Sequence, residues 1–107
     1  MSKVSPLGDD FKLFCGRANP DLGKEIAEIL SVSLGKIRIS TFADSEIHVQ
    51  IDESIRGKDI YIVQSTCEPV NENLMELLVM LDAFRRASAH QITAIIPYYG
   101  YARQDHK

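Results

Sequence analysis

DIYIVQS (residues 59–65) is the stretch that decides the fold, because its apolar residues run almost without interruption. A second run of this kind, ITAII (92–96), follows after a longer helical pattern. Such runs are typical of strands that are covered on both faces of a parallel sheet. Two parallel strands need a crossover, which is most often a helix. We therefore expect a strand–helix–strand unit with a right-handed connection at the centre of the protein.

The residues between these two runs have the pattern of an amphipathic helix. We expect this helix to begin near Asn71 or Asn73 and to end at Arg85-Arg86, where positive charge complements the helix C-terminus. The face of this helix is predicted to be marked by Leu74, Leu77, Leu78, Leu81 and Phe84 or Arg85.

The preceding part of the chain adds one strand and one helix. FKLFCG (11–16) reads as a short strand. Asn19-Pro20 then predicts a helix start, with an N-cap followed by proline at the first helical position. We expect the helix over about 20–33, with Leu34-Gly35 as its C-terminal stop.

Two further strands are marked by an alternation of apolar and polar residues. Ile37 and Ile39 alternate with polar neighbours, and the alternation resumes at Ile47, Val49 and Ile51. The short acidic segment FADSE between them is a turn, so the two strands are expected to form an antiparallel hairpin.

Together these elements predict an α/β protein with a mostly parallel sheet, flanking helices and an antiparallel hairpin flap. Residues 1–10 are expected to be a disordered lead. Residues 11–107 are expected to form one domain, because a chain of 107 residues is long enough for one domain and too short for two.

Composition and charge exclude several classes of protein. The net charge of −3 lacks the basic excess that nucleic-acid binding requires, so we expect no nucleic-acid partner. No apolar segment resembles a secretory leader or approaches the roughly 20 residues of a membrane span. We therefore expect no membrane association and a cytoplasmic location. Cys15 and Cys67 are expected to be reduced structural thiols, since neither has a second metal ligand or a base at a suitable spacing.

Ligands of open α/β sheets bind outside the carboxyl ends of the strands. Here that rule selects STCEPVNEN (65–73) and the closing stretch PYYGYARQDHK (97–107). Arg103 could hold phosphate oxygens and Gln104 could pair with a base or ribose edge, which suits a nucleotide. The alternative stays open, because Arg and Gln are common on exposed loops and the tyrosines of this stretch could simply cap the sheet.

Other polar residues have equally ordinary interpretations. Asp44 and Glu46 are common residues of a solvated turn. His48 and His90 are expected to be surface histidines, and Asp105 with His106 would make a poor cation site without further donors. The sequence has no GxxxxGK[ST] loop and no GxGxxG motif, so the usual phosphate-binding fingerprints are absent.

Several motifs taken in order resemble the N-terminal domain of the ribose-phosphate diphosphokinase family, also called phosphoribosyl diphosphate synthetases. They are FADSE, SIRG, VNENLMELL and PYYGYARQD, and the bacterial enzymes are the most similar. The resemblance implies an enzyme that transfers diphosphate from ATP to ribose 5-phosphate with Mg²⁺ and releases 5-phosphoribosyl 1-diphosphate and AMP. It also implies a phosphoribosyltransferase-like fold and a homo-oligomer, usually a homohexamer.

The resemblance also implies roles for individual residues, carried over position by position. An aromatic ring that stacks on adenine and acidic acceptors beside it fit the residues of the hairpin turn. The expected ATP-binding residues are Phe42, Asp44, Ser45, Glu46, Arg103 and Gln104. The expected regulatory residues, at a site where phosphate activates and ADP inhibits, are Ser54, Arg56 and Ser88.

The family's catalytic loop, its metal ligands and its ribose 5-phosphate loop would all follow Lys107. We therefore expect no catalytic or metal-binding residue within these 107 residues, and negligible synthetase activity from them alone. The favoured hypothesis is the N-terminal portion of the enzyme, truncated at the C-terminal end of its domain. The alternative is a non-catalytic nucleotide-binding or assembly module related to the synthetase.

Overall fold

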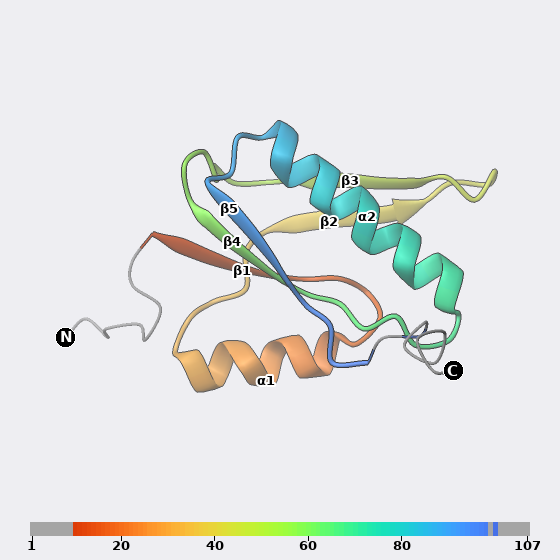
Figure 1. Cartoon of the computed structure of the whole chain (residues 1–107), viewed down its shortest axis with the longest axis horizontal. Helices are drawn as coiled ribbons and strands as arrows, with labels where there is room; N and C mark the ends of the chain where they lie inside the picture. The colour runs from red at the N-terminus through yellow and green to blue at the C-terminus, as the bar shows by residue number, and fades with distance from the viewer. Residues whose placement is uncertain (1–9, 99, 101–107) are drawn as a thin grey trace, which may run out of the picture.

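The computed structural model describes residues 10–98 and residue 100, and its centre is a three-stranded parallel sheet (Figure 1). The strands are β1 (Phe11–Cys15), β4 (Asp59–Val63) and β5 (Gln91–Ile95), in the order β1-β4-β5. Both pairings are parallel, with Leu13 opposite Tyr61 and Tyr61 opposite Thr93. The predicted mostly parallel α/β architecture is confirmed.

A separate hairpin joins the first helix to the central strand. Strands β2 (Ile37–Thr41) and β3 (Ile47–Ile51) pair antiparallel, with Thr41 opposite Ile47 next to the turn. The apolar residues of this hairpin pack on one side, as the alternation of the sequence predicts. The hairpin is therefore the expected antiparallel flap.

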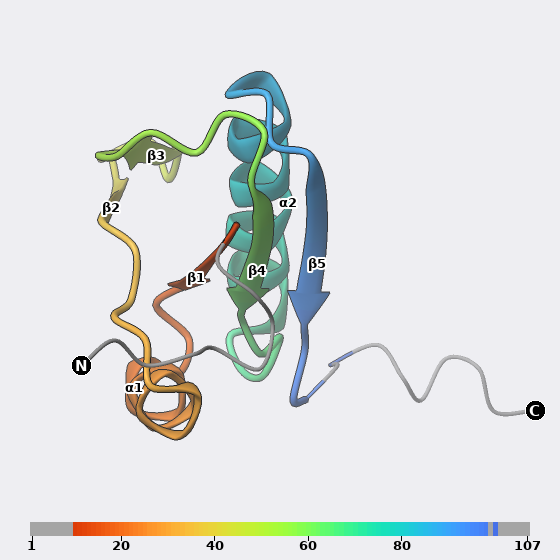
Figure 2. The same cartoon turned by 90° about the vertical axis from the view of Figure 1, so that its left-hand side faces the viewer.

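The two helices lie on opposite faces of the sheet (Figure 2). Helix α2 (Val70–Arg86) and the hairpin cover the face that carries Phe14, Ile60 and Ile62. Helix α1 (Pro20–Leu30) covers the face that carries Leu13 and Val63. Each buried aliphatic or aromatic side chain of these two clusters contributes about 1.5–3 kcal/mol of transfer free energy.

Helix α1 begins where the sequence predicts and ends earlier. The Asn19 side chain accepts a hydrogen bond from the Leu22 N–H at 3.2 Å, which confirms the N-cap. The end predicted at residue 33 is wrong, because Ser31 adopts a left-handed conformation with φ of 59° and closes the helix. The chain then runs beside β1, where the Gly35 N–H donates to the Leu13 carbonyl at 2.7 Å.

Helix α2 differs from the prediction at its start and on its face. It begins at Val70 after Pro69, without a side-chain N-cap, so the start near Asn71 or Asn73 is slightly late. Leu78 is 48% exposed, whereas Glu76 is only 3% exposed. The apolar pattern could not anticipate this burial, because Glu76 is paired with a residue far away in the sequence. The C-terminal pair Arg85-Arg86 lies in the last turn, as predicted.

Strand β5 is an edge strand within the described part of the chain, and full coverage of both its faces was a wrong prediction. Ile92 and Ala94 pack against the cluster beneath α2, whereas Thr93 is exposed and Ile95 is only partly buried. Helix α1 lies against β1 at the other edge, so this face of β5 is only partly covered. An apolar run therefore predicted a strand here but overstated its burial.

Candidate functional site

The hairpin turn is closed by its own hydrogen bonds. The Phe42 N–H donates to the Glu46 carbonyl and the Ser45 N–H donates to the Phe42 carbonyl, both at 2.9 Å. Ser45 has a φ of 70°, and the Glu46 N–H donates to the Asp44 carboxylate at 3.1 Å. One Asp44 oxygen thus stabilises the turn itself. This is the structural alternative to ligand binding that the sequence analysis kept for Asp44.

The Phe42 ring is exposed on one side and covered on the other. Its exposed fraction is 52%, and the His48 ring stacks against it with centroids 3.9 Å apart and planes 22° apart. His48 Nε2 lies 2.8 Å from the Glu46 carboxylate, which holds the imidazole in place. The turn therefore presents a supported aromatic ring and a carboxylate side by side. The sequence predicted that an aromatic ring and carboxylates share this turn, but it treated His48 as an unrelated surface histidine.

A groove of about 1100 Å³ lies beside this aromatic pair. Its lining joins strands β2 and β3 of the hairpin to the end of β1 and the first turns of α1. Phe42 and His48 supply aromatic surface, and Arg17, Lys24 and Arg38 supply positive charge. A groove that combines aromatic surface with cations is suited to a planar, anionic ligand such as a nucleotide.

The carboxyl ends of β1 and β4 meet at a buried polar cluster. The Glu76 carboxylate accepts hydrogen bonds from the Arg17 N–H at 2.6 Å and from Arg17 Nε at 2.8 Å. Gln64 Nε2 donates to Glu76 at 3.2 Å, and Gln64 Oε1 accepts from the Ala18 N–H at 3.1 Å. Gly16 leaves room for this cluster, because a Cβ at that position would overlap the Gln64 side-chain amide. No sequence motif pointed to this cluster.

The two segments that follow β4 and β5 lie side by side, as the strand-end rule predicts. The Thr66 N–H donates to the Tyr98 carbonyl at 2.8 Å, and the Gly100 N–H donates to Thr66 Oγ1 at 2.7 Å. These bonds fix the start of the closing stretch against the 65–73 loop. Arg103 and Gln104 lie outside the described residues.

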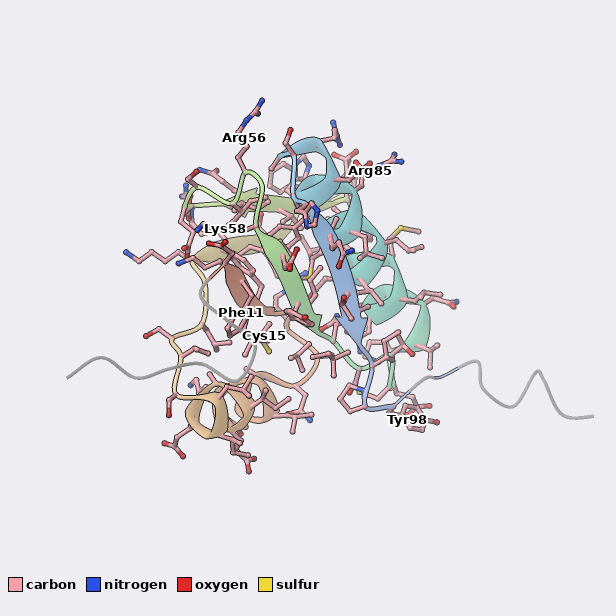
Figure 3. The ribbon with its side chains drawn as sticks, turned by 60° about the vertical axis from the view of Figure 1, so that its left-hand side comes forward. Phe11, Cys15, Arg56, Lys58, Arg85 and Tyr98 are labelled. Atoms are coloured by element: carbon pink, nitrogen blue, oxygen red, sulfur yellow. The ribbon has the colours of Figure 1, made fainter. Side chains whose placement is uncertain are left out.

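The expected regulatory residues lie near the opposite end of the sheet, where β4 and β5 begin. Arg56 Nη1 lies 3.5 Å from Ser88 Oγ, and the Gly57 N–H donates to the Ser88 carbonyl at 2.9 Å. Ser54 belongs to the same loop and is exposed. Figure 3 shows Arg56 at the opposite end of the molecule from Tyr98. The structure thus brings Arg56 and Ser88 together, away from the hairpin turn.

His90 lies at this same end of the sheet. Its Nδ1 is 2.8 Å from the Asp59 carboxylate, and its backbone N–H donates to the Lys58 carbonyl at 2.8 Å. The side chain is exposed, as the sequence predicts, but it has a specific acidic partner.

Neither cysteine belongs to a metal-binding group among the described residues. Both thiols are free and partly buried, and burial raises the pKa of the Cys15 thiol, which disfavours the nucleophilic thiolate. Among the residues that the structure describes, no three His, Cys, Asp or Glu side chains are grouped so as to hold a metal ion. No helix within this part of the chain is both long and apolar enough to cross a membrane.

Comparisons with known proteins agree with the fold. The family model for the N-terminal domain of ribose phosphate pyrophosphokinase matches residues 11–107. In a crystal structure of phosphoribosylpyrophosphate synthetase from Mycobacterium smegmatis, the similar region is 47% identical with a TM-score of 0.88, and covers 92% of this chain and 33% of that chain. A purine phosphoribosyltransferase from Pyrococcus horikoshii, 16% identical with a TM-score of 0.56 over 84% of this chain and 68% of that chain, shares the fold.

Curated relatives carry the same family name. The ribose-phosphate pyrophosphokinase of Clostridium perfringens is 60% identical over 92% of this chain and 31% of its own length. The chloroplastic ribose-phosphate pyrophosphokinase 1 of Arabidopsis thaliana is 62% identical over 97% of this chain and 26% of its own length. The chain thus spans about a third or less of the length of these relatives. It belongs to the ribose-phosphate pyrophosphokinase family, of which it represents the N-terminal domain.

Proposed function

We propose that this chain supplies the N-terminal domain of an enzyme that transfers diphosphate from ATP to the 1-hydroxyl of ribose 5-phosphate. The products are 5-phosphoribosyl 1-diphosphate and AMP. Family membership supports the reaction, and the observation that carries this domain's share of it is the supported aromatic ring of Phe42 on the hairpin turn.

The hairpin turn contributes the adenine side of ATP binding. With His48 on one face of Phe42, the other face of the ring is left for a purine base. Glu46 and the second oxygen of Asp44 are acceptors for an exocyclic amine, and the Ser45 backbone holds the turn in shape. This supports Phe42, Asp44, Ser45 and Glu46 as one group.

Arg103 and Gln104 act on the phosphates and ribose of ATP. The support for this part is the anchored start of their segment at Thr66 and Gly100 beside the carboxyl end of the sheet. An arginine there can bind two phosphate oxygens at once.

Ser54, Arg56 and Ser88 form a regulatory site for phosphate and ADP. The support is the proximity of Arg56 to Ser88 at an exposed loop on the end of the sheet opposite to the turn. A guanidinium with neighbouring hydroxyl groups suits a phosphate.

The remaining machinery belongs to the part of the full-length enzyme that this chain does not span. Mg²⁺ and ribose 5-phosphate bind in that part, which also contains the catalytic loop. The enzyme works as a homo-oligomer, the homohexamer usual in the family. Mg²⁺ supplies charge neutralisation at the transferred phosphates, and this domain supplies the position of the nucleotide.

The direct experiment is an assay of the full-length protein for AMP and 5-phosphoribosyl 1-diphosphate formation from ATP and ribose 5-phosphate. We expect activity that depends on Mg²⁺, and none from the 107 residues alone. A full-length protein that binds ATP without forming either product would favour the non-catalytic module instead.

A further inference from the structure

Arg17 connects the residue before the hairpin turn to the core of the protein. Arg17 follows the carboxyl end of β1, and its Nη2 donates to Thr41 Oγ1 at 2.8 Å. Thr41 is the last residue of β2 and directly precedes Phe42. The hydrogen bonds of the turn itself stay within the hairpin, so the link from Arg17 is a separate restraint.

Glu76 fixes the direction of the Arg17 side chain. Its carboxylate is buried and accepts from both the backbone N–H and the Nε of Arg17. The backbone bond fixes the start of the side chain and the Nε bond orients the guanidinium, while Gln64 holds the carboxylate from the other side. A buried carboxylate is costly unless it is paired, and Glu76 is paired here with Arg17 and Gln64.

The space beneath the turn is not filled by side chains. A cavity of about 350 Å³ lies between the end of the hairpin and the first turns of α2, lined by Arg17, Thr41, Ser45, Ile47, Glu72, Asn73 and Glu76. Close packing therefore does not fix the position of the turn relative to the sheet at this point. The Arg17–Thr41 hydrogen bond crosses this cavity and can fix that position.

We propose that Glu76, acting through Arg17, is a positioning residue for the ATP-binding turn. The pair sets the position of Phe42 relative to the carboxyl end of the sheet, where the closing stretch begins. This inference rests on the proposed role of Phe42 in ATP binding and assigns a further function to Glu76 and Arg17.

The test uses Thr41 in the full-length enzyme, because its hydroxyl can be removed without disturbing the buried carboxylate. Thr41→Val keeps the shape of the side chain and loses the acceptor, whereas Thr41→Ser keeps the acceptor. We expect Thr41→Val to raise the KM for ATP roughly threefold to tenfold, with the KM for ribose 5-phosphate unchanged. Thr41→Ser should restore the KM for ATP.

Hydrogen exchange provides a readout besides activity. In Thr41→Val and in Arg17→Met the amides of residues 42–46 should exchange faster, while those of β4 should not change. Lys12→Gln is the matched control, since Lys12 also pairs with a carboxylate, that of Glu53, but lies on β1 and does not line the groove beside Phe42. It should leave both the KM for ATP and the exchange of the turn unchanged.

The outcomes separate this inference from the proposed function. If Phe42→Ala weakens ATP binding but Thr41→Val changes neither the KM for ATP nor the exchange of residues 42–46, the positioning role is overturned. If Thr41→Val raises both substrate KM values together, the effect is general and the positioning role is again overturned. If Phe42→Ala leaves ATP binding unchanged, the proposed ATP site is wrong and the inference falls with it.

Discussion

The strand–helix–strand core and the hairpin turn are built in opposite ways. In the core, Ile62, Met80 and Phe84 have no exposed surface, and they are held by contact on every side. In the turn, residues 41–46 are exposed and are held by a few hydrogen bonds. The difference teaches that stability and ligand binding are separated in this domain. A change in one region should leave the property of the other nearly intact.

Truncation of Phe84 should have the largest effect on stability. Its ring packs on Phe14 at a centroid distance of 4.6 Å, and no part of it is exposed. Phe84→Ala should lower the free energy of unfolding by about 3–5 kcal/mol, measured by urea denaturation of the full-length protein. Leu78→Ala on the exposed side of the same helix is the control and should cost less than about 1 kcal/mol. Equal losses would contradict the described core.

A methyl group at Gly16 should have the next largest effect. The added Cβ would overlap Gln64 and approach Glu76, so the buried polar cluster would have to move. We expect Gly16→Ala to cost about 1–3 kcal/mol in the same denaturation experiment. An unchanged unfolding free energy would show that the cluster rearranges without cost and that it does not connect the two regions rigidly.

Low pH should weaken the interactions of Asp52 and Glu53, the two carboxylates that directly follow β3. The hydrogen bond from Arg38 lowers the pKa of Asp52. Partial burial raises the pKa of Glu53, but the Lys36 N–H and the Lys12 ammonium together outweigh it and the net shift is downward. A lowered folded-state pKa stabilises the protein above the ordinary carboxyl pKa of about 4, and this contribution is lost as the pH falls through the folded value.

If the free energy of unfolding is measured from pH 7 to pH 3, it should therefore decrease once the pH is below about 4. Arg38→Gln should reduce the part of this fall that belongs to Asp52, because it removes the partner that lowers the pKa. A variant that loses stability with the same pH dependence as the unchanged protein would contradict the role of this pair.

Much of the fold could be predicted from the sequence, because each element carries a local pattern. The apolar runs gave β4 and β5, the alternation gave the hairpin, and Asn19-Pro20 gave the start of α1. The end of α1 was predicted wrongly because the left-handed residue that ends the helix is Ser31, and not the glycine that usually marks such a position. The burial of β5 was overstated because an apolar run does not show which strand lies at an edge.

The candidate site was only partly predictable. Residues 42–46 were proposed as site residues because the segment FADSE resembles a family motif, and Arg56 and Ser88 were proposed from the same family resemblance. The pairing of Arg17 with Glu76 joins residues 59 positions apart, and no periodicity reveals such a pair. The stack of His48 on Phe42 depends on the geometry of the turn, so the alternation of the strand placed His48 merely on a polar face.

The central claim is that the exposed face of Phe42 binds adenine, and ATP titration calorimetry on full-length Phe42→Ala tests it most directly. Base–aromatic stacking contributes about 1–3 kcal/mol, so the Kd for ATP should rise at least about fivefold while the thermal midpoint stays unchanged. His48→Ala should weaken ATP binding less, since it removes only the support behind the ring. An unchanged Kd for ATP in Phe42→Ala would contradict the account.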